Sequence, residues 1–246
     1  MKLVIGSVYH ENWGWYAVQQ KFLKLTTDNY EFFIVSNDKP PFECNWVKKK
    51  KGNQNICRDH VEGIKAIYEQ FNASDADYCL LMDSDAFPVK KYWTEILTEQ
   101  IKNFDKKYAA PIRMENGDTF PHVSFLFFNK KYIDVLMPRL CDIDKTGFNF
   151  LGNNRLDVGT NLPKDTVFPL LKSNKYSPNP CFHTIYYDMV YHCGCGSRSI
   201  NMEFLDYWKT IRPKDFNFEV DSKFISTINE HFINRLLQCE RFNRFL

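Results

Sequence analysis

The 246-residue sequence has no long hydrophobic run and no excess of charge of one sign. No window of about 18 apolar residues occurs, so no transmembrane segment is expected. Lys and Arg number 32 against 30 Asp and Glu, which gives a formal net charge of +2. So small an imbalance supplies no general attraction to nucleic acid or to an anionic membrane, although it leaves room for a local basic patch.

The amino-terminal residues lack the features of a secretory signal. Residues 1–10 carry one lysine and a short apolar run, without a long apolar core or a small-residue cleavage site. Eight cysteines are scattered along the chain. In the absence of a signal we expect reduced thiols, and Cys79, which lies within an apolar stretch, is expected to pack as a small core residue. The sequence therefore predicts a cytoplasmic protein.

Aromatic residues, by contrast, are abundant. They make up 16% of the chain, with 22 Phe, 13 Tyr and 5 Trp, and we expect their rings to form much of the core. Hydrophobic residues at 44% and charged residues at 25% are typical of a globular protein. The length fits one large domain, because single α/β domains reach about 250 residues.

The first hundred residues alternate between strand-like and helix-like patterns. Short apolar runs predict strands at residues 3–8, 31–36, 46–47 and 77–82. Apolar residues at helical spacing predict three helices, carried by Trp13, Tyr16, Ala17, Gln20 and Leu23, by residues 61–71 and by residues 92–104. This order predicts an α/β fold of three layers, in which helices flank a central, mixed but mostly parallel sheet.

The second half of the chain is less regular. Strands are predicted at residues 109–113 and 123–128, and a short helix at 132–137. Residues 138–182 are rich in proline and glycine and are expected to be loops, which are often functional when they are this long. A last amphipathic helix is predicted at residues 222–237.

The most informative segment is an apolar strand that ends in two aspartates, Asp83 and Asp85. Because strand side chains alternate between faces, these two carboxylates are expected to point the same way. Ligands of α/β sheets bind just beyond the carboxyl ends of strands. Two carboxylates placed there repel each other unless a cation lies beside them, and Mg²⁺ or Mn²⁺ suits such oxygen ligands. The alternative is a solvated, aspartate-rich turn.

With this Asp-x-Asp segment, the chain resembles the glycosyltransferases of the GT-A fold. Three further segments carry the resemblance: residues 52–64, with a glycine and Arg58 at the start of a helix; residues 123–132, which resemble the acceptor-side strand; and residues 191–198, which resemble a late metal loop. The resemblance implies a GT-A-like, Rossmann-like domain that transfers a sugar from a nucleoside-diphosphate sugar, with a UDP-sugar as the expected donor.

The resemblance also implies the roles of the metal-binding residues. Asp85 would bind Mn²⁺ or Mg²⁺ directly, and Asp83 would bind the metal or the ribose of the donor. Ser84, between them, belongs to the implied donor-binding residues. His192 would complete the metal sphere through a neutral imidazole nitrogen, and its alternative is a histidine satisfied by the core or by solvent. A zinc cluster is a competing interpretation, formed by Cys181, His183, His192, Cys193 and Cys195.

The donor site is expected to include the end of the first strand and the start of the helix before the Asp-x-Asp segment. By the resemblance, Val8, Tyr9 and His10 begin the nucleotide pocket, through their backbone and the Tyr9 ring. Arg58 would contact the donor phosphates or hold the Asp-x-Asp loop, and Asp59 would hold the base or simply favour a helix N-terminus.

Two more residues of the late loop, Ser197 and Arg198, would hold the diphosphate. The run Lys48–Lys51 is expected to be solvated, or else to attract phosphates or a polyanionic acceptor. If the enzyme inverts configuration, a base must deprotonate the acceptor hydroxyl, and Asp157 is the candidate. If it retains configuration, Asp157 would position the acceptor; its structural alternative is a turn or cap.

The resemblance makes a metal-dependent glycosyltransferase the first hypothesis. It predicts one domain over residues 1–246, with a nucleotide-sugar half (1–105), an acceptor half with the metal loop (106–200) and a helical end (201–246). A saccharide or glycoconjugate is the first acceptor class, and a hydroxymethylated DNA base is the second. The alternatives are a sugar nucleotidyltransferase, or a non-catalytic nucleotide-sugar-binding protein of the same fold.

Overall fold

The computed structural model describes residues 1–10, 13–50, 56–114, 119–142, 147–148, 154–155, 158–173 and 183–193. For residues 56–58, 147–148, 154–155 and 183 it describes the backbone alone. All structural statements below concern these residues. The predicted helix at 222–237 and the late-loop residues beyond Cys193 lie outside them.

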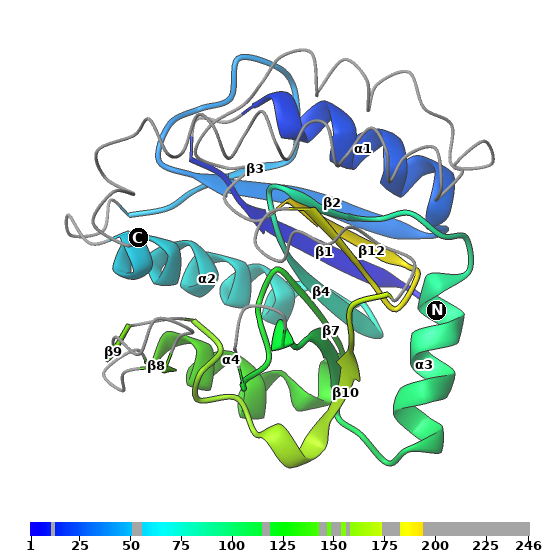
Figure 1. Ribbon diagram of the computed structural model, residues 1–246. Coiled ribbons are helices and arrows are strands. Elements are labelled where there is room, and N and C mark those ends of the chain that lie inside the picture. Colours follow the sequence, from blue (N-terminus) through cyan, green and yellow to red (C-terminus); the bar gives the residue numbers. More distant parts are fainter. Residues whose placement is uncertain are drawn as a thin grey trace.

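A seven-stranded mixed sheet forms the centre of the molecule, in the order β10-β6-β7-β4-β1-β2-β3 (Figure 1). Its neighbouring strands pair in parallel except around β7, which is antiparallel to both β4 and β6. The strands are β1 (Leu3–Val8), β2 (Tyr30–Ser36), β3 (Trp46–Lys48), β4 (Tyr78–Asp83), β6 (Tyr108–Pro111), β7 (Phe125–Asn129) and β10 (Val167–Leu170). The predicted mixed, mostly parallel sheet is confirmed.

Helices cover both faces of this sheet and make a three-layer arrangement (Figure 1). One face packs against α1 (Gly14–Thr26) and α3 (Trp93–Asn103), and the other against α2 (Ile56–Ala73) and α4 (Ile133–Cys141). Short 3₁₀ turns, η2 (Lys130–Tyr132) and η3 (Lys164–Thr166), precede α4 and β10. Aromatic rings fill both cores, as the composition predicts; Trp15 and Trp93 are among the largest fully buried side chains.

Two smaller sheets complete the described fold. The first is antiparallel and has the order β11-β12-β5, formed by β11 (His183–Tyr186), β12 (Val190–Cys193) and β5 (Ala86–Pro88). The second pairs β8 (Gly147–Phe148) with β9 (Asn154–Arg155). Since β5 follows β4 after a turn of two residues, the three-stranded sheet is attached directly to the end of the central sheet.

The structure corrects three local predictions. The buried face of α1 is formed by Trp15, Tyr16, Val18, Gln19, Phe22, Leu23 and Thr26, whereas the predicted Ala17 is exposed. The short helix continues to Cys141 and contains Pro138 as its sixth residue, where a proline removes one backbone hydrogen bond of the helix. His192 lies inside β12 and not in a loop.

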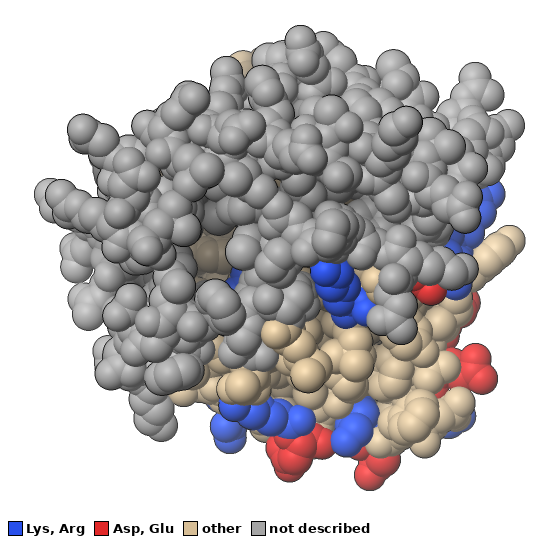
Figure 2. Space-filling model, viewed as in Figure 1, with Lys and Arg blue, Asp and Glu red and all other residues tan. Residues whose placement is uncertain are grey.

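The described surface mixes both charge signs. Figure 2 shows basic and acidic side chains close together along the described part of this face. That mixture agrees with the nearly balanced composition. No helix among the described residues is long and apolar enough to cross a membrane.

Candidate metal centre and nucleotide pocket

The Asp-x-Asp segment lies where β4 leaves the central sheet. Asp83 is the last residue of β4, Ser84 and Asp85 form a tight turn, and Ala86 begins β5. The two aspartates therefore do not share one regular strand, and strand alternation is not what brings their carboxylates together. Asp85 is buried at 3% exposure, Asp83 is half-buried, and Ser84 between them is buried.

The register of the smaller sheet brings His192 to this turn. His192 pairs with Ala86 across β12 and β5, and the backbone N–H of Cys193 donates to the carbonyl of Asp85 at 2.9 Å. The imidazole Nε2 lies 3.8 Å from Asp85 Oδ1. One ligand atom each of Asp83, Asp85 and His192 can lie within 4.8 Å of the others.

This donor set fits a divalent cation of the Mn²⁺ or Mg²⁺ type. Two carboxylates supply hard oxygen ligands, and a neutral imidazole supplies one nitrogen, which suits Mn²⁺ better than Mg²⁺. A buried carboxylate such as Asp85 is costly unless a cation or hydrogen bonds compensate its charge. The three groups come from two sheets, β4 with its turn and β12, so the fold and not local sequence assembles them.

Two further histidines lie beside the cluster, and neither was predicted as a site residue. His60 Nε2, on α2, lies 3.5 Å from Asp83 Oδ1. His122 is buried, its Nδ1 accepts the backbone N–H of Ser124 at 3.1 Å, and its ring centroid is 5.7 Å from that of His192. No local sequence signal marks them: His60, His122 and His192 are more than 60 residues apart along the chain, and only the fold brings them together.

A buried ion pair lies next to the end of β1. Lys49 is 3% exposed, and its Nζ lies 2.5 Å from Asp59 Oδ1 in the first turn of α2. The other carboxylate oxygen, Oδ2, is 3.2 Å from Nδ1 of His10. Lys49 is thus not solvated, whereas Lys48 and Lys50 are exposed, as expected for the lysine run, and Lys51 lies outside the described residues. Through these contacts Asp59 links the first turn of α2 to the residues that follow β1 and β3. This favours a structural role for Asp59 at the start of the helix over a role in holding the base.

A pocket of about 140 Å³ opens where β1 and β2 end. It is lined by Tyr9, His10, Trp13, Ser36, Asn37 and Asp38. The side chain of Val8 is turned away from it and packs against Gly63 of α2, where a Cβ would come within 2.7 Å of Val8 Cγ1.

The walls of this pocket combine two aromatic rings, Tyr9 and Trp13, with the polar side chains of His10, Ser36, Asn37 and Asp38. Tyr9 is fully buried, burial raises its pKa, and its ring stacks on Trp13 at a centroid distance of 5.8 Å. The half-buried Trp13 therefore offers more ring surface to a ligand than the predicted Tyr9. Asn37 Oδ1 is buried without a hydrogen-bond partner among the described residues. An acceptor left unpaired in this way is satisfied when a ligand donates to it.

The remaining predicted residues cannot be placed in the site. The side chain of Arg58 and all of Asp157, Ser197 and Arg198 lie outside the described residues. So do Cys181, Cys195 and the side chain of His183 of the alternative zinc cluster, while Cys193 is buried in β12. The cluster with metal-ligand geometry among the described side chains is formed by two aspartates and His192, without a cysteine.

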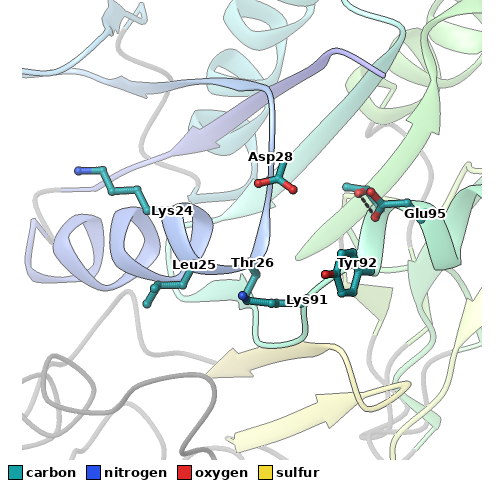
Figure 3. A pocket seen from close by; sticks show the side chains of 8 residues that line it. Lys24, Leu25, Thr26, Asp28, Lys91, Tyr92 and Glu95 are labelled. Carbon is teal, nitrogen blue, oxygen red and sulfur yellow. Dashed lines mark hydrogen bonds between the residues drawn. The ribbon is translucent and has the colours of Figure 1, made fainter.

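A second hollow, of about 200 Å³, lies away from these residues. It is formed where α1 ends and α3 begins, with Lys24, Leu25 and Thr26 on one side and Lys91, Tyr92 and Glu95 on the other (Figure 3). The chain runs from the end of α1 into the start of β2, and Asp83 lies at the end of the parallel strand β4. This hollow and Asp83 are therefore at opposite ends of the strands. It mixes basic and acidic side chains.

Several solved structures are distantly similar to this chain. No protein-family model and no curated protein matches the sequence. Among solved structures, CMP:2-keto-3-deoxy-manno-octonic acid synthetase complexed with CTP is similar over 56% of this chain and 77% of its own, with 10% identity and a TM-score of 0.38.

The glycosyltransferase GlyE of Streptococcus pneumoniae TIGR4 is also similar. One structure matches over 71% of this chain with 14% identity and a TM-score of 0.44, and its apo form over 58% with 14% identity and a TM-score of 0.38. This chain spans 46% and 38% of those two GlyE chains.

Proposed function

We propose that this protein is a metal-dependent glycosyltransferase, which transfers a sugar from a nucleoside-diphosphate sugar to a hydroxyl acceptor. The observation that carries the proposal is the cluster of Asp83, Asp85 and His192 at the carboxyl end of β4. This is the edge of a parallel sheet where α/β proteins bind their ligands. A divalent cation held there stabilises the negative charge that develops on the diphosphate as the sugar bond breaks.

The pocket at the ends of β1 and β2 supports a nucleotide as the leaving group. Val8 of β1 is paired with Asp83 of β4, so the pocket and the aspartates share one edge of the sheet. In this proposal a base of the uracil type stacks on Trp13 and donates an N–H to Asn37 Oδ1. Ser197 and Arg198 hold the diphosphate, and Arg58 contacts it or supports the aspartate turn.

The acceptor site is proposed to include Asp157. Gly159, two residues later, has φ +103° and packs against the carbonyl of Pro121, the neighbour of His122. In an inverting reaction Asp157 takes the proton of the acceptor hydroxyl, and in a retaining reaction it orients the acceptor. A saccharide or glycoconjugate is the proposed acceptor, and a hydroxymethylated DNA base is included in the test.

The decisive experiment measures nucleoside-diphosphate release from a panel of UDP- and other nucleotide-sugars with Mn²⁺ and both acceptor classes. We expect Asp85→Ala to abolish Mn²⁺-dependent donor binding and to lower turnover at least about 100-fold, because it removes a ligand of the cation that stabilises the negative charge on the leaving diphosphate. Asp28→Ala, at the opposite end of the strands, is the matched control and should leave both unchanged.

The alternatives give different products. A sugar nucleotidyltransferase would release pyrophosphate from a nucleoside triphosphate and a sugar phosphate, and a non-catalytic protein would bind a nucleotide-sugar without turnover. The proposal fails if the wild-type protein shows neither diphosphate release nor metal-dependent donor binding with any member of the panel.

A further inference from the structure

The side chain of Gln19 lies in the middle of the buried face of α1. It is 0% exposed, and its neighbours along this face are mostly apolar: Trp15, Tyr16, Val18, Phe22 and Leu23. A primary amide at such a position is costly unless each of its polar atoms is hydrogen-bonded. The hydrogen-bond partners of Gln19 therefore explain why a polar side chain is found on the buried face of α1.

Gln19 binds the two ends of the aspartate turn. Its Nε2 donates to the carbonyl of Asp83 at 2.7 Å and to the carbonyl of Ala86 at 2.7 Å. Ser84 and Asp85 lie between these two carbonyls, so one amide group sets the span of the whole turn. A carboxylate or a hydroxyl cannot replace it, since a carboxylate has no donor and a hydroxyl has one.

Tyr9 fixes the direction of this amide. The Tyr9 hydroxyl donates to Gln19 Oε1 at 2.6 Å, which leaves the Nε2 end directed at the turn. Burial raises the pKa of Tyr9, so its hydroxyl stays protonated and remains a donor throughout the neutral range. The ring of Tyr9 in turn stacks on Trp13 in the wall of the nucleotide pocket.

We infer that Gln19 is a positioning residue for the metal centre: by clamping the carbonyls of Asp83 and Ala86 it holds the Asp85 carboxylate beside His192. It touches neither substrate nor metal. The inference rests on the proposed function for the identity of the metal, but the clamp itself is a property of the protein alone. The two parts can therefore be tested by separate measurements.

The first measurement is amide hydrogen exchange over residues 83–86 in the full chain without metal. Gln19→Met keeps the length of the side chain and removes both donors, and we expect exchange in this turn to become at least tenfold faster. The matched control is Thr26→Val on the same helix, which removes a buried hydrogen bond from Thr26 Oγ1 to the carbonyl of Phe22. It should leave exchange at the turn unchanged.

The second measurement is Mn²⁺ affinity by electron paramagnetic resonance. We expect Gln19→Met to bind Mn²⁺ at least tenfold more weakly than Thr26→Val, and Tyr9→Phe, which only loosens the amide, to show a loss of about threefold. Unchanged exchange at the turn in Gln19→Met, or equal Mn²⁺ affinity in Gln19→Met and Thr26→Val, overturns the inference. If Gln19→Met does not fold, Tyr9→Phe decides by the same two readouts.

A wild-type protein that binds no Mn²⁺ overturns the proposed function instead. In that case the exchange experiment still decides whether Gln19 clamps the turn.

Discussion

Lys49 places a full positive charge in the interior of the molecule. Its side chain is completely buried, and its Nζ meets both a carboxylate oxygen and the backbone carbonyl of Asp59. Buried lysines are rare unless they are paired, because an isolated ammonium loses its hydration without compensation. The pair thus fastens the end of β3 to the first turn of α2, immediately beside His10 at the end of β1.

Removing one partner of a buried ion pair costs more stability than replacing both partners by apolar residues, and this difference can be tested at Lys49 and Asp59. Lys49→Met should destabilise the fold by about 3 kcal/mol, since it leaves the Asp59 carboxylate without its main partner. The double variant Lys49→Met/Asp59→Leu should recover most of that loss, because an apolar pair of similar volume avoids the desolvation cost. Urea denaturation of the wild type and the variants, including Asp59→Leu alone, completes a double-mutant cycle. Additive changes in unfolding free energy would contradict the pairing.

At the scale of elements, α2 and β1 touch too closely for a side chain at Gly63. A Cβ there would lie 2.7 and 2.8 Å from the two γ-carbons of Val8. Val8 cannot withdraw, because its strand is held between β2 and β4. Glycine inside α2 is therefore explained by packing, and its helix-propensity cost of about 1 kcal/mol is the price of that contact.

Gly63→Ala should accordingly destabilise the protein by up to about 2 kcal/mol, the overpacking penalty of about 1–3 kcal/mol less a gain in helix propensity of about 1 kcal/mol. Val8→Ala combined with Gly63→Ala makes room for the new methyl group, so the double variant should lose less than the sum of the single changes. Thermal or urea unfolding measures both. Stabilisation by Gly63→Ala alone would show that α2 can move away from β1 at little cost.

Much of the central sheet was predictable, because an uninterrupted run of apolar residues in the sequence predicts a buried strand. Residues 3–8 match β1 and the run at 31–36 begins one residue late, whereas the strand at 77–82 is displaced by one because Asp83 continues the β4 ladder. The hairpin of β11 and β12 was missed. Its turn carries Tyr187 and Asp188 at φ 52° and 53°, in place of the glycine or asparagine that normally marks such turns.

The residues of the metal cluster were predicted together through the resemblance, but no sequence pattern shows how the fold assembles them. The aspartates follow an apolar strand in the sequence, and that context identified them. His192 reaches them only through the pairing of β12 with β5, more than a hundred residues along the chain from Asp85. Gln19 was overlooked because the predicted stripe of α1 places Ala17 and Gln20, along with the correctly predicted Tyr16 and Leu23, on the buried face, although Ala17 is exposed and Gln20 only half-buried. A polar residue within the correct stripe is the signal that would have found it.

At the scale of the whole molecule, both cores contain ionisable groups that are kept neutral. Burial raises the pKa of the Cys79 thiol from 9.0 to about 12 and that of Cys141 to about 11, on the face covered by α2 and α4. On the other face, burial raises the pKa of Tyr9. These groups remain protonated in the folded protein at pH values where the unfolded chain loses its protons, and this difference links global stability to alkaline pH.

Because these pKa values are raised in the folded protein, its unfolding free energy should fall as the pH becomes alkaline. Because the folded pKa of Cys79 lies above its unfolded value, its contribution to stability is complete below about pH 9 and is lost as the pH rises toward 12. Cys79 alone should then lower the unfolding free energy by about 1.4 kcal/mol per pH unit within this window. Urea denaturation under reducing conditions at pH 8, pH 10 and pH 11 measures this loss, with the slope taken between pH 10 and pH 11. Cys79→Ala should be less stable than the wild type at pH 8, since it leaves a small cavity, but its stability should fall less steeply. Parallel losses in the two proteins would mean that the thiol of Cys79 ionises as readily in the folded protein as in the unfolded chain.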